Sequence, residues 1–436
     1  MVSFVLARLR GAAWLAMATV AGGAPATFWS DHASAAEVAQ APAALRSALE
    51  AAWARHPLSA ATDATLEAAQ ARSDAAAQPL YNPEFEVNAD DEGPDRTVTA
   101  GIGLTLDLSG KRKARTTAAV AGLDTATAEA RLRRRDFAQA WLDAWAATTA
   151  AERRVALGSQ RLALIIHFAE LADRQFKVGD ISSLDRDLAW LARDEAGAEQ
   201  AALLGELANA QEALHRVDTG SPEATPGTVR PGFPDAASLP AVGDRTVDVS
   251  TLPEWVLGEA GAELANAQVK VAERDRLADP TVTLRGGSIE LADGVRDGMF
   301  GLSISMPLFV RNSYRAEVVA AKADARAAAA DLARLRLDLE ARAERTAATY
   351  GAIHKAWQQW QLSPGTDVER RAALLERLWR AGELSTTDYL LQLRQTLDTA
   401  LAGADLEGRL WSSYTDYLAA TGQLEDWLGL AVARSE

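Results

Sequence analysis

The sequence predicts a mainly α-helical fold with a small β part, built from two tandem repeats of long coiled-coil helices and β-hairpins. Three observations predict it: a motif that recurs about 200 residues later, very long helical patterns without proline, and strand patterns that precede them. An internal repeat of this kind indicates that one structural unit was duplicated.

The repeated motif is an aromatic residue, a basic residue, any residue, glycine, an acidic residue, an aliphatic residue and serine. The two copies are Phe176-Lys177-Val178-Gly179-Asp180-Ile181-Ser182 and Trp379-Arg380-Ala381-Gly382-Glu383-Leu384-Ser385. Glycine adopts positive φ easily, so Gly179 and Gly382 predict tight turns between antiparallel helices. Asp185 and Asp388 follow the motifs, where an aspartate can cap the next helix.

The N-terminal region has the features of a secretory signal peptide, which we place at residues 1–35. Arg8 and Arg10 precede an apolar stretch at 11–21, and Ala33-Ser34-Ala35 resembles a cleavage site. A membrane anchor is the alternative, but the stretch is shorter than the about 20 apolar residues that cross a bilayer. No other window is a continuous apolar span, so we expect an exported protein without an inner-membrane helix.

The first repeat, placed at residues 36–216, should contain a helix, a β-hairpin, a long helix and a further helix. Helical spacing of apolar residues and alternation with period two distinguish these elements. The turn residues Glu92-Gly93-Pro94-Asp95 join the two strands. The expected elements are a helix at 45–76, strands at 84–90 and 97–109, and helices at 111–178 and 185–215.

The second repeat, placed at residues 252–436, has the same order. The expected elements are a helix at 254–277, a strand containing Val282 and Leu284, a turn at Asp293-Gly294, a strand at 300–308, and helices at 311–381 and 388–427. Ser363-Pro364-Gly365 should break the long helix, because proline disrupts helical hydrogen bonding. Residues 217–251, rich in Pro, Gly and Thr, are predicted to link the repeats.

The composition excludes several classes of function. The formal net charge of -15 repels nucleic acid, so no nucleic-acid partner is expected. Without cysteine the chain has no disulfide, thiolate metal site or thiol nucleophile. The five histidines lack metal-binding spacing, and no nucleophile elbow or phosphate loop is found. We therefore expect no enzyme, no cofactor and no metal site.

The strand patterns leave two interpretations open, a membrane-spanning sheet or a half-buried sheet of a soluble protein. Four strands cannot close a membrane barrel, since the smallest have about eight, and an open edge in lipid leaves backbone groups unpaired. If the strands span lipid, the protein must therefore oligomerise. Several copies would form a closed barrel on a sheath of helices.

The doubled motif, with Asp185 or Asp388 following it, resembles the periplasmic tip of the TolC-like outer-membrane efflux proteins. Gly110-Lys111-Arg112 and Pro307-Leu308-Phe309, which start the long helices, resemble the heavy-metal branch of that family, which serves cobalt, zinc, cadmium and copper pumps. The resemblance covers essentially the whole mature chain. It implies a homotrimer with a 12-stranded barrel in the outer membrane of a Gram-negative bacterium and a helical tunnel through the periplasm.

The resemblance also implies partners and a site. A periplasmic adaptor would dock on the tip, and an inner-membrane pump of the resistance, nodulation and division type would supply the energy. The candidate docking residues are Gly179, Asp180, Ser182, Gly382, Glu383 and Ser385. Asp185 and Asp388 are candidate gate residues, whereas Leu391 stands where the family has a second aspartate. A duct for drugs or for a type I secreted protein remains an alternative, as does a soluble periplasmic coiled-coil scaffold.

Overall fold

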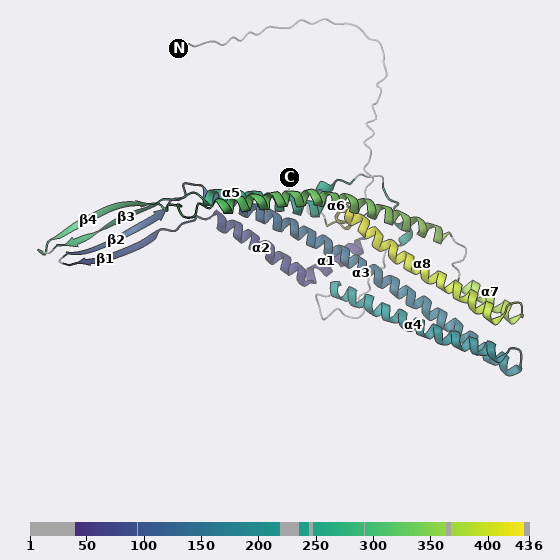
Figure 1. Cartoon of the computed structure of the whole chain (residues 1–436). Helices are drawn as coiled ribbons and strands as arrows, with labels where there is room; N and C mark the ends of the chain where they lie inside the picture. Colours follow the sequence, from purple (N-terminus) through teal and green to yellow (C-terminus); the bar gives the residue numbers. More distant parts are fainter. Residues whose placement is uncertain are drawn as a thin grey trace, which may run out of the picture. The chain divides into compact units, whose positions relative to one another are not determined.

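The computed structural model describes residues 40–93, 95–218, 235–243, 247–291, 293–362 and 368–430, which belong to one unit, Gln40–Glu436. The signal peptide predicted at 1–35 and the break predicted at Ser363-Pro364-Gly365 lie outside the described residues. Long helices and one small sheet make up the described unit (Figure 1), so the predicted fold class is confirmed.

The first helical segment contains two helices, α1 (Ala43–Arg55) and α2 (Pro57–Ala77). His56 between them is extended, because a residue that precedes proline avoids the helical region. Pro57 takes the first position of α2, where its missing N–H is not needed, and Nδ1 of His56 accepts from the N–H of Leu58 at 3.1 Å. The prediction of one continuous helix was therefore wrong.

The longest element is α3, which covers Lys111–Val178 as predicted. Its 68 residues correspond to about 100 Å at the helical rise. α4 (Ser183–Asp218) packs back along α3, and α2, α5 and α8 also contact α3 (Figure 1). This helix therefore connects elements of the first and the second half of the chain.

The second half contains five helices in its described part. They are α5 (Pro253–Asp275), α6 (Arg315–Gln361), α7 (Val368–Arg380), α8 (Thr386–Ala420) and α9 (Leu424–Leu428). The predicted helix at 388–427 was wrong at its end, because Gly422 has a φ of +72° and closes α8. The N–H of Gln423 donates to the carbonyl of Leu418 at 2.9 Å, and α9 follows as a separate short helix.

The described part of the predicted linker holds two 3-10 turns, η1 (Ala236–Ser238) and η2 (Val249–Thr251). Between them, the hydroxyl of Tyr350 on α6 donates to the carbonyl of Pro240. The imidazole of His354, one turn further along α6, is hydrogen-bonded to the carbonyl of Leu239 at 3.2 Å. The connecting segment is thus held against α6.

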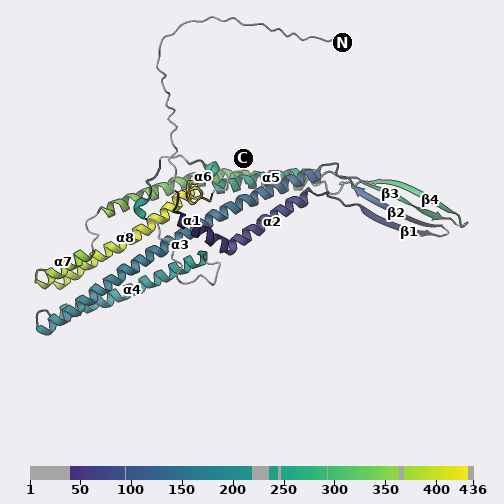
Figure 2. The same cartoon turned by 180° about the vertical axis from the view of Figure 1, so that it is seen from behind.

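Four strands form one antiparallel sheet in the order β1-β2-β3-β4. They are β1 (Glu84–Glu92), β2 (Asp95–Thr105), β3 (Thr281–Glu290) and β4 (Arg296–Ser305). Both hairpins were predicted, and pairing of β2 with β3 joins them into one sheet (Figure 2). Among the described strands, β1 and β4 each have one edge without a strand partner.

The two faces of the sheet differ in polarity. Ile102 lies opposite Phe85 and Leu284, and these side chains are 58 %, 74 % and 49 % exposed. The other face is polar, and Arg285 lies across it, 4.0 Å from Glu86. Gly101 makes this possible, because a Cβ there would lie 3.1 Å from the Cβ of Arg285.

One apolar core lies where α3, α4, α7 and α8 meet. The ring of Phe168 stacks on Tyr389 with a centroid distance of 4.2 Å and meets Trp379 edge-on at 4.8 Å. Ala172, Ala189 and other small residues around these rings are buried, which lets the helices approach closely. The core therefore holds the two helical hairpins together.

One described helix, α3, contains an 18-residue window with a mean hydropathy of 1.2, long and apolar enough to cross a membrane, and 33 % of that window is buried. This window was not predicted from the sequence. Core helices of soluble proteins pass the same test, because helix packing also requires apolar residues.

Candidate functional site

The first turn joins α3 to α4 at Gly179–Ser182. Gly179 has a φ of +87°, and its N–H donates to the carbonyl of Phe176 at 3.0 Å. The N–H of Asp180 donates to the carbonyl of Gln175 at 2.9 Å. These two bonds satisfy the last carbonyls of α3, and only glycine adopts this backbone without strain.

Ser182 and Asp185 form a reciprocal cap on α4. The hydroxyl of Ser182 accepts from the N–H of Asp185 at 3.1 Å and donates to the carboxylate of Asp185 at 2.6 Å. The same carboxylate accepts from the N–H of Ser182 at 3.3 Å. Asp185 therefore stabilises the start of α4, which was one of the two roles considered for it.

The second turn, at Gly382–Ser385, repeats this geometry between α7 and α8. Gly382 has a φ of +74°, and the N–H of Glu383 donates to the carbonyl of Leu378 at 3.0 Å. Ser385 accepts from the N–H of Asp388 at 3.1 Å and donates to its carboxylate at 2.7 Å. The carboxylate of Asp388 is exposed.

The structure brings the two turns together. The hydroxyl of Ser182 is the main cause that lowers the pKa of Asp185, burial opposes it, and the hydroxyl of Thr386 at the start of α8 also lowers it. The indole N–H of Trp379 donates to Thr386 at 3.1 Å. Ile181 of the first turn and Leu384 of the second pack against the same aromatic core of the four helices.

Sequence reasoning missed an aromatic and arginine cluster at the first turn. The guanidinium of Arg186 lies 4.2 Å from the ring centroid of Phe176 and 4.9 Å from that of Trp190. Trp190 is 40 % exposed. Phe176 belongs to the repeated motif, but its contact with α4 depends on how the two helices pack.

Exposed apolar side chains flank both turns. They are Val178, Leu184, Leu191 and Leu391, at 73 %, 67 %, 65 % and 63 % exposure. Apolar surface of this kind marks interaction sites more often than isolated surface residues do. Both turns thus present apolar side chains to solvent.

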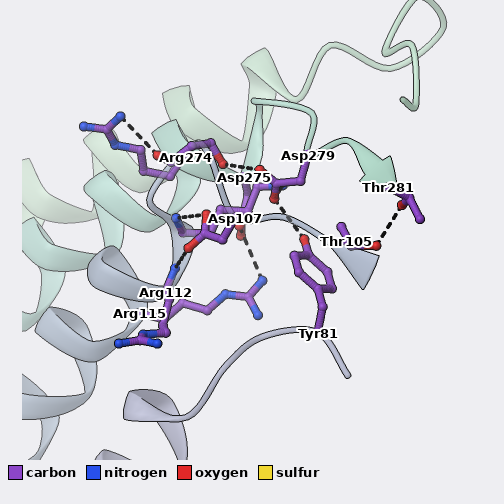
Figure 3. A network of polar contacts seen from close by, with 11 residues as sticks. Tyr81, Thr105, Asp107, Arg112, Arg115, Arg274, Asp275, Asp279 and Thr281 are labelled. Atoms are coloured by element: carbon purple, nitrogen blue, oxygen red, sulfur yellow. Dashed lines mark hydrogen bonds and ion pairs between the residues drawn. The ribbon is translucent and has the colours of Figure 1, made fainter. Parts of the chain in front are cut away.

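A second polar site connects the sheet to the helices (Figure 3). The carboxylate of Asp279, before β3, accepts from the hydroxyls of Tyr81 at 2.9 Å and Ser109 at 2.8 Å. The Nζ atom of Lys111 lies 3.0 Å from the same carboxylate, and the side chains of Lys111 and Asp279 are 10 % and 2 % exposed. One buried carboxylate thus ties together the segments before β1, after β2 and before β3.

The charged groups at this junction form an ion pair and hydrogen bonds with their neighbours. Burial raises the pKa of Asp279, but hydrogen bonds from Lys111, Ser109 and Tyr81 outweigh it and leave the pKa below its ordinary value. Asp107 accepts from the N–H groups of Lys111 and Arg112, both at 2.8 Å, and so caps α3. These contacts fix the first turn of α3 against the end of the sheet.

The described residues contain no group of three or more His, Cys, Asp or Glu side chains that could hold a metal ion. The acidic residues of the turns instead bond to serine hydroxyls and backbone N–H groups. At the turns and at the junction, these polar contacts cap helices and connect segments of the chain.

Known proteins resemble this chain in sequence and in fold. No protein-family model matches the chain. The cobalt-zinc-cadmium resistance protein CzcC of Cupriavidus metallidurans is 26 % identical over 244 residues, which cover 54 % of this chain and 56 % of that protein. The chain thus matches about half the length of this relative.

Solved structures are similar over more of the chain. The Campylobacter jejuni outer membrane channel CmeC has a TM-score of 0.72 and 14 % identity over 87 % of this chain and 86 % of that one. CusC, which forms a transmembrane channel, has a TM-score of 0.72 and 15 % identity over 88 % of this chain and 92 % of that one. The resemblance inferred from the repeated motif is confirmed, and the chain has the fold of the TolC-like outer-membrane channels.

Proposed function

We propose that this protein is the outer-membrane channel of a tripartite efflux system, a passive conduit that extends into the periplasm. The chain would comprise a cleaved signal peptide at 1–35 and two structural repeats at 36–216 and 252–436, linked by residues 217–251. Three copies would supply twelve strands for one closed barrel. Their helices would form the periplasmic tunnel below it.

The observation that carries this proposal is the four-stranded sheet, which has one apolar face and, among the described strands, two edges without a partner. Phe85 and Phe300 on that face are 74 % and 78 % exposed, and a large exposed apolar patch marks a surface that contacts a partner or a membrane. Lipid would cover this face, and neighbouring copies would pair with the edges of β1 and β4. The soluble scaffold considered from the sequence would leave both uncovered.

The two helical turns are the proposed docking surface for a periplasmic adaptor. Gly179, Asp180, Ser182, Gly382, Glu383 and Ser385 shape the turns, and exposed apolar side chains lie beside them. An inner-membrane pump of the resistance, nodulation and division type would supply the energy. The channel itself would require no catalytic group.

Heavy-metal cations are the proposed cargo, and the similarity to CzcC supports this choice. A duct for drugs or for a type I secreted protein shares the fold and is the second candidate. Deletion of the gene followed by growth on graded zinc, cobalt, cadmium, copper, dyes and antibiotics distinguishes them. New metal sensitivity is expected, and unchanged metal tolerance with new drug sensitivity would reject the metal assignment.

Membrane fractionation tests the channel itself. The protein should be recovered from outer membranes as an oligomer that dissociates on heating, and it should form conducting pores in planar bilayers. Recovery as a soluble periplasmic monomer would reject the proposal.

A further inference from the structure

A row of alternating charges crosses the sheet near the turns that join β1 to β2 and β3 to β4. It consists of Asp91, Arg96, Glu290 and Arg296, one residue on each strand, and we name it the charge ladder. The pairing register places each residue directly opposite the next, so the ladder lies at one level across the sheet.

The charge ladder lies on the apolar face. Side chains alternate between the faces of a strand, and Arg96 is two residues before Val98, which is 51 % exposed on that face. Its register partners Asp91 and Glu290 therefore point the same way. The ladder forms a charged border to a mostly apolar surface.

The position of this border agrees with the thickness of a membrane. β2 ends at Thr105, nine residues beyond Arg96, and there the polar junction around Asp279 begins. Nine residues at the strand rise span about 31 Å, or about 23 Å along the membrane normal if the strands tilt by about 40°. The apolar band of outer-membrane barrels is about 25 Å tall.

The arginines of the ladder keep donors for a further ligand. Arg96 donates through Nε to Asp91 at 3.1 Å, and Arg296 donates through Nε and Nη2 to Glu290 at 3.1 and 3.0 Å. A guanidinium carries five N–H donors, so each has others to offer. The two side chains are 73 % and 74 % exposed.

We infer that the charge ladder binds the phosphate groups of an anionic lipid headgroup in the outer leaflet, with Arg96 and Arg296 as donors. Arginine suits phosphate because its planar fork donates two parallel hydrogen bonds. Charged side chains on a lipid-facing surface are tolerated at the interface and not at the midplane, which places the ladder at headgroup level. The inference rests on the proposed function, because it requires the apolar face to contact lipid.

Titration of the purified, delipidated oligomer with bisphosphoryl lipid A in detergent, followed by native mass spectrometry, tests this site. In the double variant Arg96→Gln/Arg296→Gln the dissociation constant should rise about tenfold or more, because two charge-assisted contacts are lost. Binding of phosphatidylcholine should stay unchanged. A lipid A affinity within about twofold of the parent would overturn the inference.

Two further variants separate binding from folding. Arg285→Gln removes an arginine from the polar face of the same sheet and should leave lipid A binding unchanged, and an equal loss in this variant would overturn the site. Asp91→Asn/Glu290→Gln breaks the same ion pairs but frees the arginines, so it should tighten binding, whereas a purely structural ladder predicts weaker binding.

Planar-bilayer conductance keeps the two proposals distinguishable. The parent protein and the two variants of the charge ladder should conduct, since the ladder lies outside the conduit. A parent that binds lipid A through the ladder without conducting would reject the channel and leave the binding site standing. A parent that conducts while Arg96→Gln/Arg296→Gln binds lipid A normally would reject the binding site and leave the channel standing.

Discussion

Replacing Lys111 by methionine removes the cation from the buried pair at the junction between sheet and helices. The Nζ atom of Lys111 lies 3.0 Å from the carboxylate of Asp279, and this carboxylate would stay buried with the hydrogen bonds of Tyr81 and Ser109. Breaking one partner of a buried pair costs about 3–5 kcal/mol. Because two neutral donors remain, we expect about 3 kcal/mol, or about a hundredfold in the unfolding equilibrium.

Urea titration of the detergent-solubilised protein, followed by tryptophan fluorescence, measures this loss. Lys111→Met/Asp279→Asn should be less destabilised than the sum of its two single variants, because the double change leaves no unpaired buried charge. Arg115→Met is the matched control. Its partner Asp275 lies at 3.4 Å and the Arg115 side chain is 47 % exposed, so its loss should be under about 1 kcal/mol.

The pH dependence of folding stability tests the same ion pair. The pKa of Asp279 is lowered in the folded protein, so its contribution is present above the unfolded pKa of about 4 and is lost as the pH falls through the folded value. Without Lys111, burial would raise the pKa of Asp279, and the variant should gain stability relative to the parent on acidification. An equal loss of stability below pH 4 in both proteins would refute the reasoning, as would additive single effects.

Three further predictions concern the helices and their turns. Gly382→Ala should cost about 1–2 kcal/mol in urea unfolding, because its φ is +74°, whereas Gly122→Ala in the interior of α3 should be neutral or stabilising. Burial raises the pKa of Asp143 to about 6, although a hydrogen bond from Thr415 opposes it, so stability should fall as the pH rises from about 4 to about 6. Asp143→Asn should recover about 2 kcal/mol at pH 7. Asp388→Asn should change single-channel conductance and its block by multivalent cations if Asp388 gates the conduit, and parental values would leave it a helix cap.

Local features of the sequence were enough to predict the long helices and the turns. A 68-residue stretch without proline forms α3 at its predicted bounds, and Gly179 and Gly382 end their helices as the motif indicated. The serine and aspartate pairs that follow cap α4 and α8. These outcomes depend on contacts within a few residues, which spacing in the sequence reports directly.

Helix boundaries were predicted wrongly where a single residue interrupts a helical pattern. Pro57 begins a helix at its first position, but it was not recognised as a boundary within the long apolar pattern. Gly422 likewise ends α8 inside a run of residues with helical spacing. In both cases one residue with a restricted or unusual backbone outweighed the periodicity around it.

Most helices, both hairpins and the turn residues follow from local sequence, because helical and strand periodicity and glycine chemistry act over short distances. Tertiary packing alone shows that β2 pairs with β3, that Ile181 and Leu384 of the two turns pack against one core, and that Ser109 meets Asp279 across 170 residues of chain. Such contacts depend on the register and packing of elements distant in sequence, and each partner alone carries no signal for the other.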